Sequence, residues 1–340
     1  MTPPLVPLAQ LGQWLKQTGY SFVTPTPATH ARVNARDSSR ESRSVEDVFG
    51  WSRPFRKSLL PGHVIELLQQ AGALEPQGAL LRSKVRFSTL GDRLFVHSAF
   101  PTLDPDAVFF GPDTYRFASL IRNTLATQPA VRAARILDVG CGSGAGGIVA
   151  LGASFEPIKL ILTDVNPKAL LYAEVNATLA GVEASFRQGD LFADIDERVD
   201  LIVANPPYLV DPEARLYRHG GGELGSLLSL RIVRECQDHL APGGRLILYT
   251  GSPIIRGRDL LREAIEEATR DAPLACTYSE LDPDVFGEEL AMPAYAEADR
   301  IAAVAIVLTS TRTRFDVAGP GARSEEAPPP IPGSIMPGQI

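Results

Sequence analysis

This 340-residue sequence has little of what supports disulfide-rich, zinc-binding or membrane-spanning proteins. Its three cysteines, Cys141, Cys236 and Cys276, are widely separated and form no CxxC pair, so neither a disulfide framework nor a zinc site is expected. No run of about 18 apolar residues is present, so no membrane-spanning helix is expected. Residues 1–20 lack both a basic leader and a long apolar stretch, which predicts a cytoplasmic protein without a secretory signal.

Positive charge is also in deficit. The chain carries 33 Lys and Arg against 40 Asp and Glu, a formal net charge of −7, which argues against a nucleic-acid-binding surface over the chain as a whole. Residues 1–100 differ, with 12 basic against 7 acidic side chains. This mild excess of positive charge is compatible with an anionic binding partner, although a solvated basic face explains it more simply.

The sequence of residues 1–104 predicts a small α+β domain. We expect this domain to recognise a ligand or to act as a lid. Apolar residues at helical spacing predict a helix within residues 1–20, and Pro61 and Gly72 mark the ends of a second helix. The polar stretch 29–47 between them is interpreted as a loop or linker. Two strand-like runs then flank a turn at Gly91, and helices followed by such a hairpin also match the outline of a winged helix.

From about residue 131 strands and helices alternate. Nearly continuous apolar strands are predicted at residues 135–140, 159–165, 184–190, 199–206, 244–251 and 301–310. Such strands alternating with helices imply an α/β fold, a doubly wound and mostly parallel sheet covered on both faces. We expect the Pro- and Gly-rich tail, residues 313–340, to be disordered.

A glycine-rich loop follows the first of these strands. Asp138, Gly140 and Gly142 stand between the strand and the next helix, where glycine lets the backbone turn sharply and approach a ligand. A tight strand-to-helix turn would need the same residues. The second strand closes on Asp164 and the third on Asp190, which brings three acidic residues to the carboxyl edge of the sheet, where ligands bind. Each of these aspartates could instead cap a helix.

The stretches LDVGCGSG, LTDVNP, QGDLF and NPPY occur in that order and resemble the class I S-adenosylmethionine-dependent methyltransferases. The resemblance covers roughly residues 105–312, which we assign to a catalytic domain, and implies a Rossmann-like sheet of seven strands and S-adenosyl-L-methionine as cofactor. It also implies roles for the motif residues: Asp138 on the methionine amino group, Gly140 and Gly142 beside it, Asp164 on the ribose and Asp190 on the adenine. Val165 and Leu191 are also expected to contact the cofactor. A dinucleotide-binding dehydrogenase is the rival, but its fingerprint is G-x-G-x-x-G and this loop runs G-C-G-S-G-A-G.

The fourth predicted strand ends in Asn205-Pro206-Pro207-Tyr208. A planar nitrogen accepts a methyl group well when both of its N–H hydrogens are held, so that its face is turned toward the donor. The Asn205 side chain and the Pro206 carbonyl can accept those hydrogens, while Pro207 fixes the angle and Tyr208 stacks on the acceptor. We expect Asn205, Pro206 and Tyr208 to be catalytic, with Asn205 also touching the cofactor. A simple turn that ends the strand would use the same residues.

Asn-Pro-Pro-Tyr is the signature of N-methyltransferases of planar nitrogens, which narrows the resemblance to a divergent relative of the release-factor glutamine N5-methyltransferases, a small-domain methyltransferase. The match is partial. The segment 111–115 lacks the arginine and the closing glutamate of that branch, and the fifth strand lacks its Glu-x-Gly ending. We expect Phe110, Pro207, Tyr208 and His219 to contact the substrate. Phe109 and Phe110 precede Gly111 and could form a wall of the acceptor pocket, although packing in the core would explain them equally well. We expect no metal, because acidic loop residues usually face water.

The sequence thus predicts an S-adenosylmethionine-dependent N-methyltransferase acting on a protein glutamine side chain or on a small biosynthetic molecule. A nucleic-acid base is a less favoured acceptor, with the basic residues 1–100 as its docking surface. A third possibility is intramolecular cyclisation of the cofactor's aminobutyrate arm, which releases methylthioadenosine. A fourth is a non-catalytic binding module. No membrane partner is expected.

Overall fold

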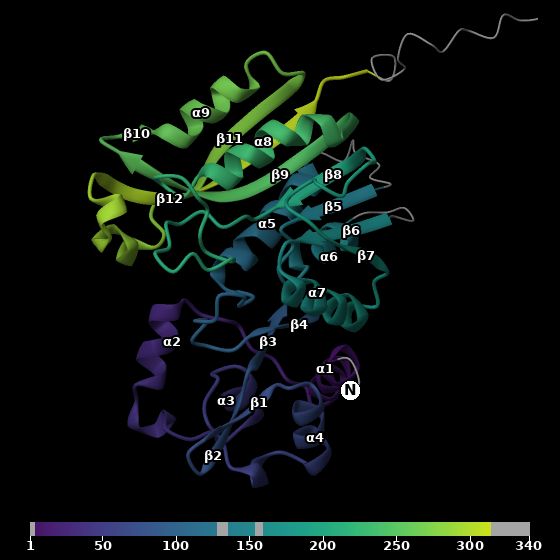
Figure 1. Ribbon diagram of the computed structural model, residues 1–340, viewed down its shortest axis with the longest axis vertical. Helices are drawn as coiled ribbons and strands as arrows, with labels where there is room; N and C mark the ends of the chain where they lie inside the picture. Colours follow the sequence, from purple (N-terminus) through teal and green to yellow (C-terminus); the bar gives the residue numbers. More distant parts are fainter. Residues whose placement is uncertain (1–3, 128–134, 154–158, 314–340) are drawn as a thin grey trace, which may run out of the picture.

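The computed structural model describes residues 4–127, 135–153 and 159–313 (Figure 1). Its centre is one twisted sheet with the strand order β11-β12-β9-β8-β5-β6-β7, and the two-residue strand β10 pairs only with β9. The strands are β5 (Arg135–Val139), β6 (Lys159–Asp164), β7 (Ala184–Gln188), β8 (Val199–Ala204), β9 (Leu240–Ile255), β10 (Arg258–Asp259), β11 (Leu274–Asp282) and β12 (Ala298–Ser310). The five strands from β9 to β7 are parallel, and β12 runs antiparallel to both of its neighbours. The predicted seven-stranded, mostly parallel sheet is confirmed.

Helices cover both faces of the sheet because side chains alternate across each strand. Ile136 of β5 lies in one apolar cluster with α5 (Pro112–Thr127), α6 (Ala145–Gly152) and α7 (Pro167–Ala180). The next residue, Leu137, lies in the cluster on the opposite face with α8 (Leu227–His239) and α9 (Leu260–Thr269). Both residues are fully buried, as expected for a central strand of a doubly wound sheet.

All six predicted strands are present, but the edge strand β11 was not predicted. Its nine residues, LACTYSELD, are mostly exposed and pair with β12 through backbone hydrogen bonds. A strand that buries little apolar surface leaves no continuous apolar run in the sequence, so the pattern that identified the other strands is missing here.

The N-terminal region contains more helix than predicted. It consists of α1 (Leu5–Gln17), α2 (Pro27–Asn34), α3 (Val45–Phe49) and α4 (Gly62–Gln70), two short 3₁₀ turns (Asp37–Ser39 and Lys57–Leu59), and the hairpins β1–β2 (Leu74–Gln77, Leu80–Ser83) and β3–β4 (Val85–Leu90, Arg93–Ser98). The prediction that residues 29–47 form a loop is therefore wrong at both ends, where residues 29–34 and 45–47 are helical, while residues 35–44 are irregular apart from one 3₁₀ turn. Capping stabilises the helices at its two ends, because Thr26 accepts a hydrogen bond from the Thr29 amide and Ser44 accepts one from the Asp47 amide, both at 3.2 Å.

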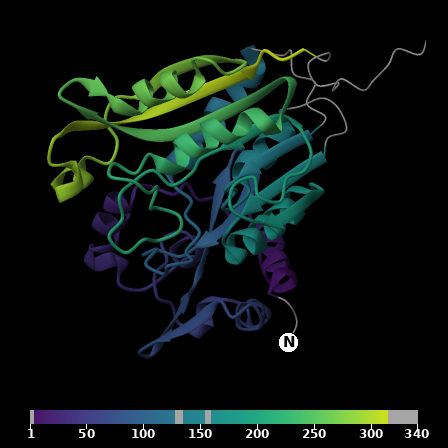
Figure 2. The same ribbon diagram turned by 45° about the horizontal axis from the view of Figure 1, so that its top comes forward.

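The N-terminal region packs on helix α7 (Figures 1 and 2). Apolar residues of α1, α4 and both strands of the β3–β4 hairpin share one core with Ala169, Tyr172, Val175 and Leu179 of α7. The buried Asn176 of α7 accepts a hydrogen bond from the Val96 amide (2.7 Å) and donates to the carbonyls of Val96 (3.0 Å) and Ser143 (2.9 Å). One side chain thereby joins strand β4 to the glycine-rich loop.

Residues 314–340, which make up nearly all of the tail predicted to be disordered, lie outside the described residues. None of the described helices is both long and apolar enough to cross a membrane.

Candidate active site

A cavity of about 240 Å³ lies at the carboxyl ends of β5, β6 and β8. Its walls come from the glycine-rich loop, the ends of these strands, the Asn-Pro-Pro-Tyr segment and the first turn of α5. Pro27 and Thr102 add a wall from the N-terminal side, and Leu216, Tyr217 and Arg218 close it from the loop after the Asn-Pro-Pro-Tyr segment. Sequence motifs that are far apart along the chain therefore meet in one cavity, as predicted for the switch point of an open sheet.

The glycine-rich loop presents backbone to the cavity. Gly140 (φ +64°) and Gly142 (φ +53°) have left-handed conformations that disfavour any other residue type. A Cβ atom at either position would meet no other atom within 4 Å, so each glycine faces open space in the cavity wall. The loop thus leaves room for a ligand to approach the main chain.

Asp138 ends strand β5 and is almost fully buried, with 1% of its surface exposed. Its carboxylate accepts a 2.7 Å hydrogen bond from the Gly147 amide in the first turn of α6. Burial raises the pKa of Asp138 to about 7, the neighbouring charge of Asp164 adds to this, and the Gly147 amide opposes it. Asp138 therefore has the helix-capping contact that the sequence left open, and it also lines the cavity.

Asp164 is the last residue of strand β6, and its carboxylate binds backbone amides of two turns. One carboxylate oxygen accepts from the Gly142 amide at 2.9 Å, and the other accepts from the Asn166 amide at 2.9 Å. Burial raises the pKa of Asp164, and these amide hydrogen bonds oppose the shift. A carboxylate oxygen has more than one lone pair, so Asp164 can still accept from the two hydroxyls of a ribose. The next residue, Val165, lines the cavity and is 45% exposed.

Asp190 and Leu191 also line the cavity, after strand β7. The Asp190 carboxylate is more than half exposed and forms a salt bridge with Arg231 of α8 at 3.1 Å. This ion pair was not predicted. It holds Asp190 at the cavity edge, where its remaining lone pairs can accept from an adenine amino group.

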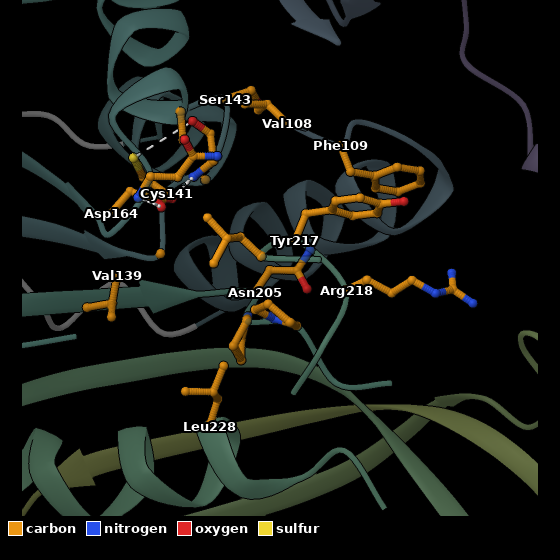
Figure 3. A pocket seen from close by; sticks show the side chains of 18 of the residues that line it. Val108, Phe109, Val139, Cys141, Ser143, Asp164, Asn205, Tyr217, Arg218 and Leu228 are labelled. Atoms are coloured by element: carbon orange, nitrogen blue, oxygen red, sulfur yellow. Dashed lines mark hydrogen bonds between the residues drawn. The ribbon is translucent and has the colours of Figure 1, made fainter. Parts of the chain in front are cut away.

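Asn205, Pro206, Pro207 and Tyr208 all line the cavity. Figure 3 shows Asn205 in the middle of the cavity, between Tyr217 on one side and Cys141 and Asp164 on the other. Within the described residues, neither the Asn205 side chain nor the Pro206 carbonyl forms a hydrogen bond with the protein. Both groups are therefore free to accept hydrogen bonds from a ligand.

The Tyr208 ring is packed more tightly than expected for a ring that stacks freely on an acceptor. It is 7% exposed and lies edge-on to Tyr249 (ring centroids 6.3 Å apart) and Phe286 (5.9 Å). Its ring also covers Gly251, where a Cβ atom would approach the ring to 2.4 Å. A glycine in β9 is thus required for Tyr208 to lie where it does.

Two predicted substrate residues do not line the cavity. Phe110 is 1% exposed and packs between Phe95 and His97 in the core, so the expected contact with substrate is not supported. His219 lies in the loop beyond Arg218, and its Nδ1 accepts from the Asp211 amide at 3.2 Å. Of the two phenylalanines considered for the pocket wall, Phe109 lines the cavity and stacks on Tyr217 with ring centroids 5.5 Å apart.

Asp113 is the site residue that the sequence did not identify. It lies in the first turn of α5, lines the cavity, and is nearly buried beside Tyr208 and Tyr249. The sequence feature that could have identified it is its acidic side chain within the segment 111–115. Nothing in the sequence near residue 113 shows that it meets residues 208 and 249.

The residues present fit S-adenosylmethionine. Open glycines next to buried carboxylates suit a cationic amino acid group, and paired amide contacts on Asp164 leave acceptor sites for a ribose. No group of three or more His, Cys, Asp or Glu able to hold a metal ion occurs in residues 4–127, 135–153 and 159–313.

Comparisons with known proteins agree with this arrangement. Residues 117–271 match the model of the family described as methyltransferase small domain. The release factor glutamine methyltransferase of Bordetella pertussis is 32% identical over 192 residues, which cover 52% of this chain and 68% of that protein. The release factor glutamine methyltransferase of Deinococcus radiodurans is 40% identical over 129 residues, covering 34% and 44%.

Among solved structures, a SAM-dependent methyltransferase from Agrobacterium tumefaciens matches with a TM-score of 0.46 and 18% identity, covering 70% of this chain and 72% of that chain. The chain spans about half the length of the first curated relatives it matches.

Proposed function

This chain belongs to the S-adenosylmethionine-dependent methyltransferases, and we propose that it transfers the methyl group of that cofactor to a planar amide or amine nitrogen. One observation carries the proposal: Asn205 and Pro206 present two carbonyl oxygens, without partners among the described residues, in the cavity that also holds Asp138 and Asp164. Two fixed acceptors suit a nitrogen that carries two hydrogens.

Cofactor binding is assigned to the end of the cavity at β5, β6 and β7. Asp138 binds the amino group, Asp164 the ribose hydroxyls and Asp190 the adenine amino group, with Val165 and Leu191 as the apolar walls beside the base. The bound cofactor supplies a methyl group already activated on a sulfonium. The protein's part is therefore to hold the two reactants in line and to exclude water.

Acceptor binding is assigned to the opposite end. The Asn205 side chain and the Pro206 carbonyl accept the two N–H hydrogens of the nitrogen, which turns its lone pair toward the methyl group. Pro206 and Pro207 hold the two carbonyls at a fixed angle because the proline ring restricts the backbone. The Phe109–Tyr217 pair forms a flat wall on which a planar group can lie (Figure 3).

The acceptor is proposed to be a glutamine side chain of a protein or a small biosynthetic molecule. The relatives named for release factor glutamine methylation support an amide acceptor. A nucleic-acid base is less favoured by the cavity's charge. Among its described lining residues four are aspartates, and the one cation, Arg218, extends away from the other labelled side chains in Figure 3.

The N-terminal region, residues 1–104, is proposed to recognise the acceptor, and residues 105–312 to carry out the transfer. Pro27 and Thr102 support this division, since they add a wall of the cavity next to Tyr217. The Tyr217 hydroxyl donates to the Thr102 carbonyl at 3.0 Å, which joins the two regions at the cavity.

The test is incubation with methyl-labelled cofactor and a panel of acceptors: an intact release factor, a free glutamine peptide, amine metabolites and RNA. Label on a protein or small-molecule nitrogen, together with release of S-adenosylhomocysteine, is the expected result. Label only on RNA would favour the nucleic-acid alternative. Methylthioadenosine formed without any acceptor would show the intramolecular reaction and overturn methyl transfer.

A further inference from the structure

A buried carboxylate stands behind the acceptor end of the cavity. Asp113 is 6% exposed, comes from the first turn of α5, and lies where the positive end of the helix dipole favours an anion. Within the proposed function this carboxylate has no assigned role, since the cofactor is placed at the other end and the acceptor is held by Asn205 and Pro206.

Two side chains bind this carboxylate, and a third lies against it. The Tyr249 hydroxyl of β9 donates to Asp113 Oδ1 at 2.7 Å. Arg116, one turn further along α5, lies 3.3 Å from the same oxygen and also binds Asp282 of β11 at 2.9 Å. The third is Tyr208, whose ring lies edge-on to that of Tyr249 and whose hydroxyl lies near enough to the carboxylate to influence its pKa.

The Tyr208 ring is confined by Gly251 beneath it and by Tyr249 and Phe286 at its edges. Asp113 holds Tyr249 in this place through the hydrogen bond from the Tyr249 hydroxyl. Tyr208 is continuous with the prolines that aim the Asn205 and Pro206 carbonyls. A rotation or shift of the ring would therefore move the acceptor-binding oxygens as well.

Asp113 and Tyr249 also stand where the chain departs from the glutamine branch that it resembles. Asp113 lies in the divergent segment 111–115, and Tyr249 stands two residues before Gly251, in place of the glutamate of the Glu-x-Gly ending. The two departures contact each other directly. Their contact places Tyr249 against the Tyr208 ring, although 136 residues separate Asp113 from Tyr249 in sequence.

We propose that Asp113 is the positioning residue of the acceptor site: its carboxylate binds the Tyr249 hydroxyl, which fixes the Tyr249 ring against Tyr208 and, through Tyr208, the Asn-Pro-Pro acceptor carbonyls. This assignment rests on the proposed methyl transfer to a planar nitrogen. Asp113 acts through Tyr208 and does not touch the reacting atoms.

The positioning carries a pH dependence. Burial raises the pKa of Asp113, while the hydrogen bonds from Tyr249 and Tyr208 and the charge of Arg116 oppose that shift. The other charged group that faces this cluster is Asp282, which is paired with Arg116. As the pH falls through the raised pKa of Asp113, the carboxylate becomes protonated and its hydrogen bond from the Tyr249 hydroxyl weakens.

The first test needs no acceptor. Protein labelled with ¹³C at the tyrosine ζ carbons is titrated by NMR, with the signals assigned by Tyr208→Phe and Tyr249→Phe. The Tyr208 and Tyr249 signals are expected to shift together, with one midpoint above the ordinary carboxylate value, and Asp113→Asn should abolish that shift. A Tyr208 signal that does not titrate, or the same titration in Asp113→Asn, overturns the proposal.

The second test is kinetic, at saturating cofactor and acceptor. Asp113→Asn is expected to lower kcat by about ten- to a hundredfold, as misplacement of a reactant does, and to remove the acidic limb of the pH profile, with cofactor Kd within about twofold of wild type. Asp282→Asn is the matched control, because it removes a carboxylate from the same arginine without a contact to Tyr208, and should leave kcat unchanged.

The outcomes separate the two proposals. Wild-type kcat and an unchanged pH profile in Asp113→Asn would overturn the positioning role alone. A wild-type protein that methylates none of the acceptors would overturn the proposed function, and the NMR titration would then still decide whether Asp113 anchors Tyr208.

Discussion

The two ends of the cavity are built in different ways. At the cofactor end, carboxylates bind backbone amides of the turns that follow β5 and β6: Asp138 binds Gly147, and Asp164 binds Gly142 and Asn166. At the acceptor end, side chain binds side chain across a long separation, as Tyr249 does with Asp113. The cofactor end therefore depends on the main chain at the ends of two neighbouring strands, whereas the acceptor end depends on how side chains of separate elements pack together.

The largest effect is expected when one of the acceptor-binding carbonyls is removed. This change should impair the acceptor end of the cavity and spare the cofactor end. Asn205→Ala should lower kcat by roughly 10²–10³-fold, the loss typical of one preorganised catalytic hydrogen-bonding group, while cofactor affinity stays within a few-fold. Radiolabel transfer and calorimetric titration of the cofactor measure the two quantities. An equal loss of cofactor affinity would mean that Asn205 belongs mainly to the cofactor end.

The converse change is made at Asp164. Asp164→Ala removes the ribose acceptor and the bridge between the amides of Gly142 and Asn166, so cofactor Kd should rise by about 10- to 100-fold, the equivalent of one hydrogen bond to a charged group. At saturating cofactor, kcat should recover to near wild type. Failure of kcat to recover would show that the glycine-rich loop also shapes the acceptor end.

A pH titration of cofactor binding tests the cofactor end without a mutation. The pKa of Asp138 is raised to about 7 by burial, so lowering the pH through 7 protonates the carboxylate and removes the negative charge facing the cofactor's amino group. Cofactor affinity should then fall by up to about tenfold per pH unit below 7 and stay level just above it. Asp138→Asn should bind weakly at every pH and lack this dependence, and a wild-type affinity that is level down to pH 5 would contradict the assignment.

The smallest effect is expected at the edge of the cavity. Arg231→Ala removes the half-exposed ion pair with Asp190, so the free energy of unfolding should change by no more than about 1 kcal/mol. Because the Asp190 carboxylate is then free for the adenine, cofactor affinity should stay equal or rise slightly. A clear loss of affinity in calorimetry would show that Arg231 itself contacts the cofactor.

The same contrast explains what the sequence could predict. Asp138, Gly140 and Gly142 follow one strand within a few residues, so their meeting is a property of local chain geometry. Asn205 was predictable because its strand lies next to the first one in the sheet. The sequence also indicated six strands, and five of them, all but the edge strand β7, form largely buried runs.

The acceptor end was less accessible to sequence reasoning. Phe109 lines the cavity and Phe110 does not. Adjacent side chains point in different directions, and the sequence does not show which of the two faces the cavity. The Asp113–Tyr249 contact has no local signal at all. The helices at the two ends of residues 29–47 were missed because few apolar residues mark them and capping by Thr26 and Ser44 supports them.

The buried Asn176 gives the molecule a thermodynamic link between its two regions. Its amide binds strand β4 on one side and the Ser143 carbonyl of the glycine-rich loop on the other. A ligand that orders the glycine-rich loop also stabilises the arrangement in which Asn176 binds both the Ser143 carbonyl and strand β4. Such a ligand therefore favours the β3–β4 hairpin in its packed position. By reciprocity, an acceptor that binds and steadies the N-terminal region must raise cofactor affinity by the same factor.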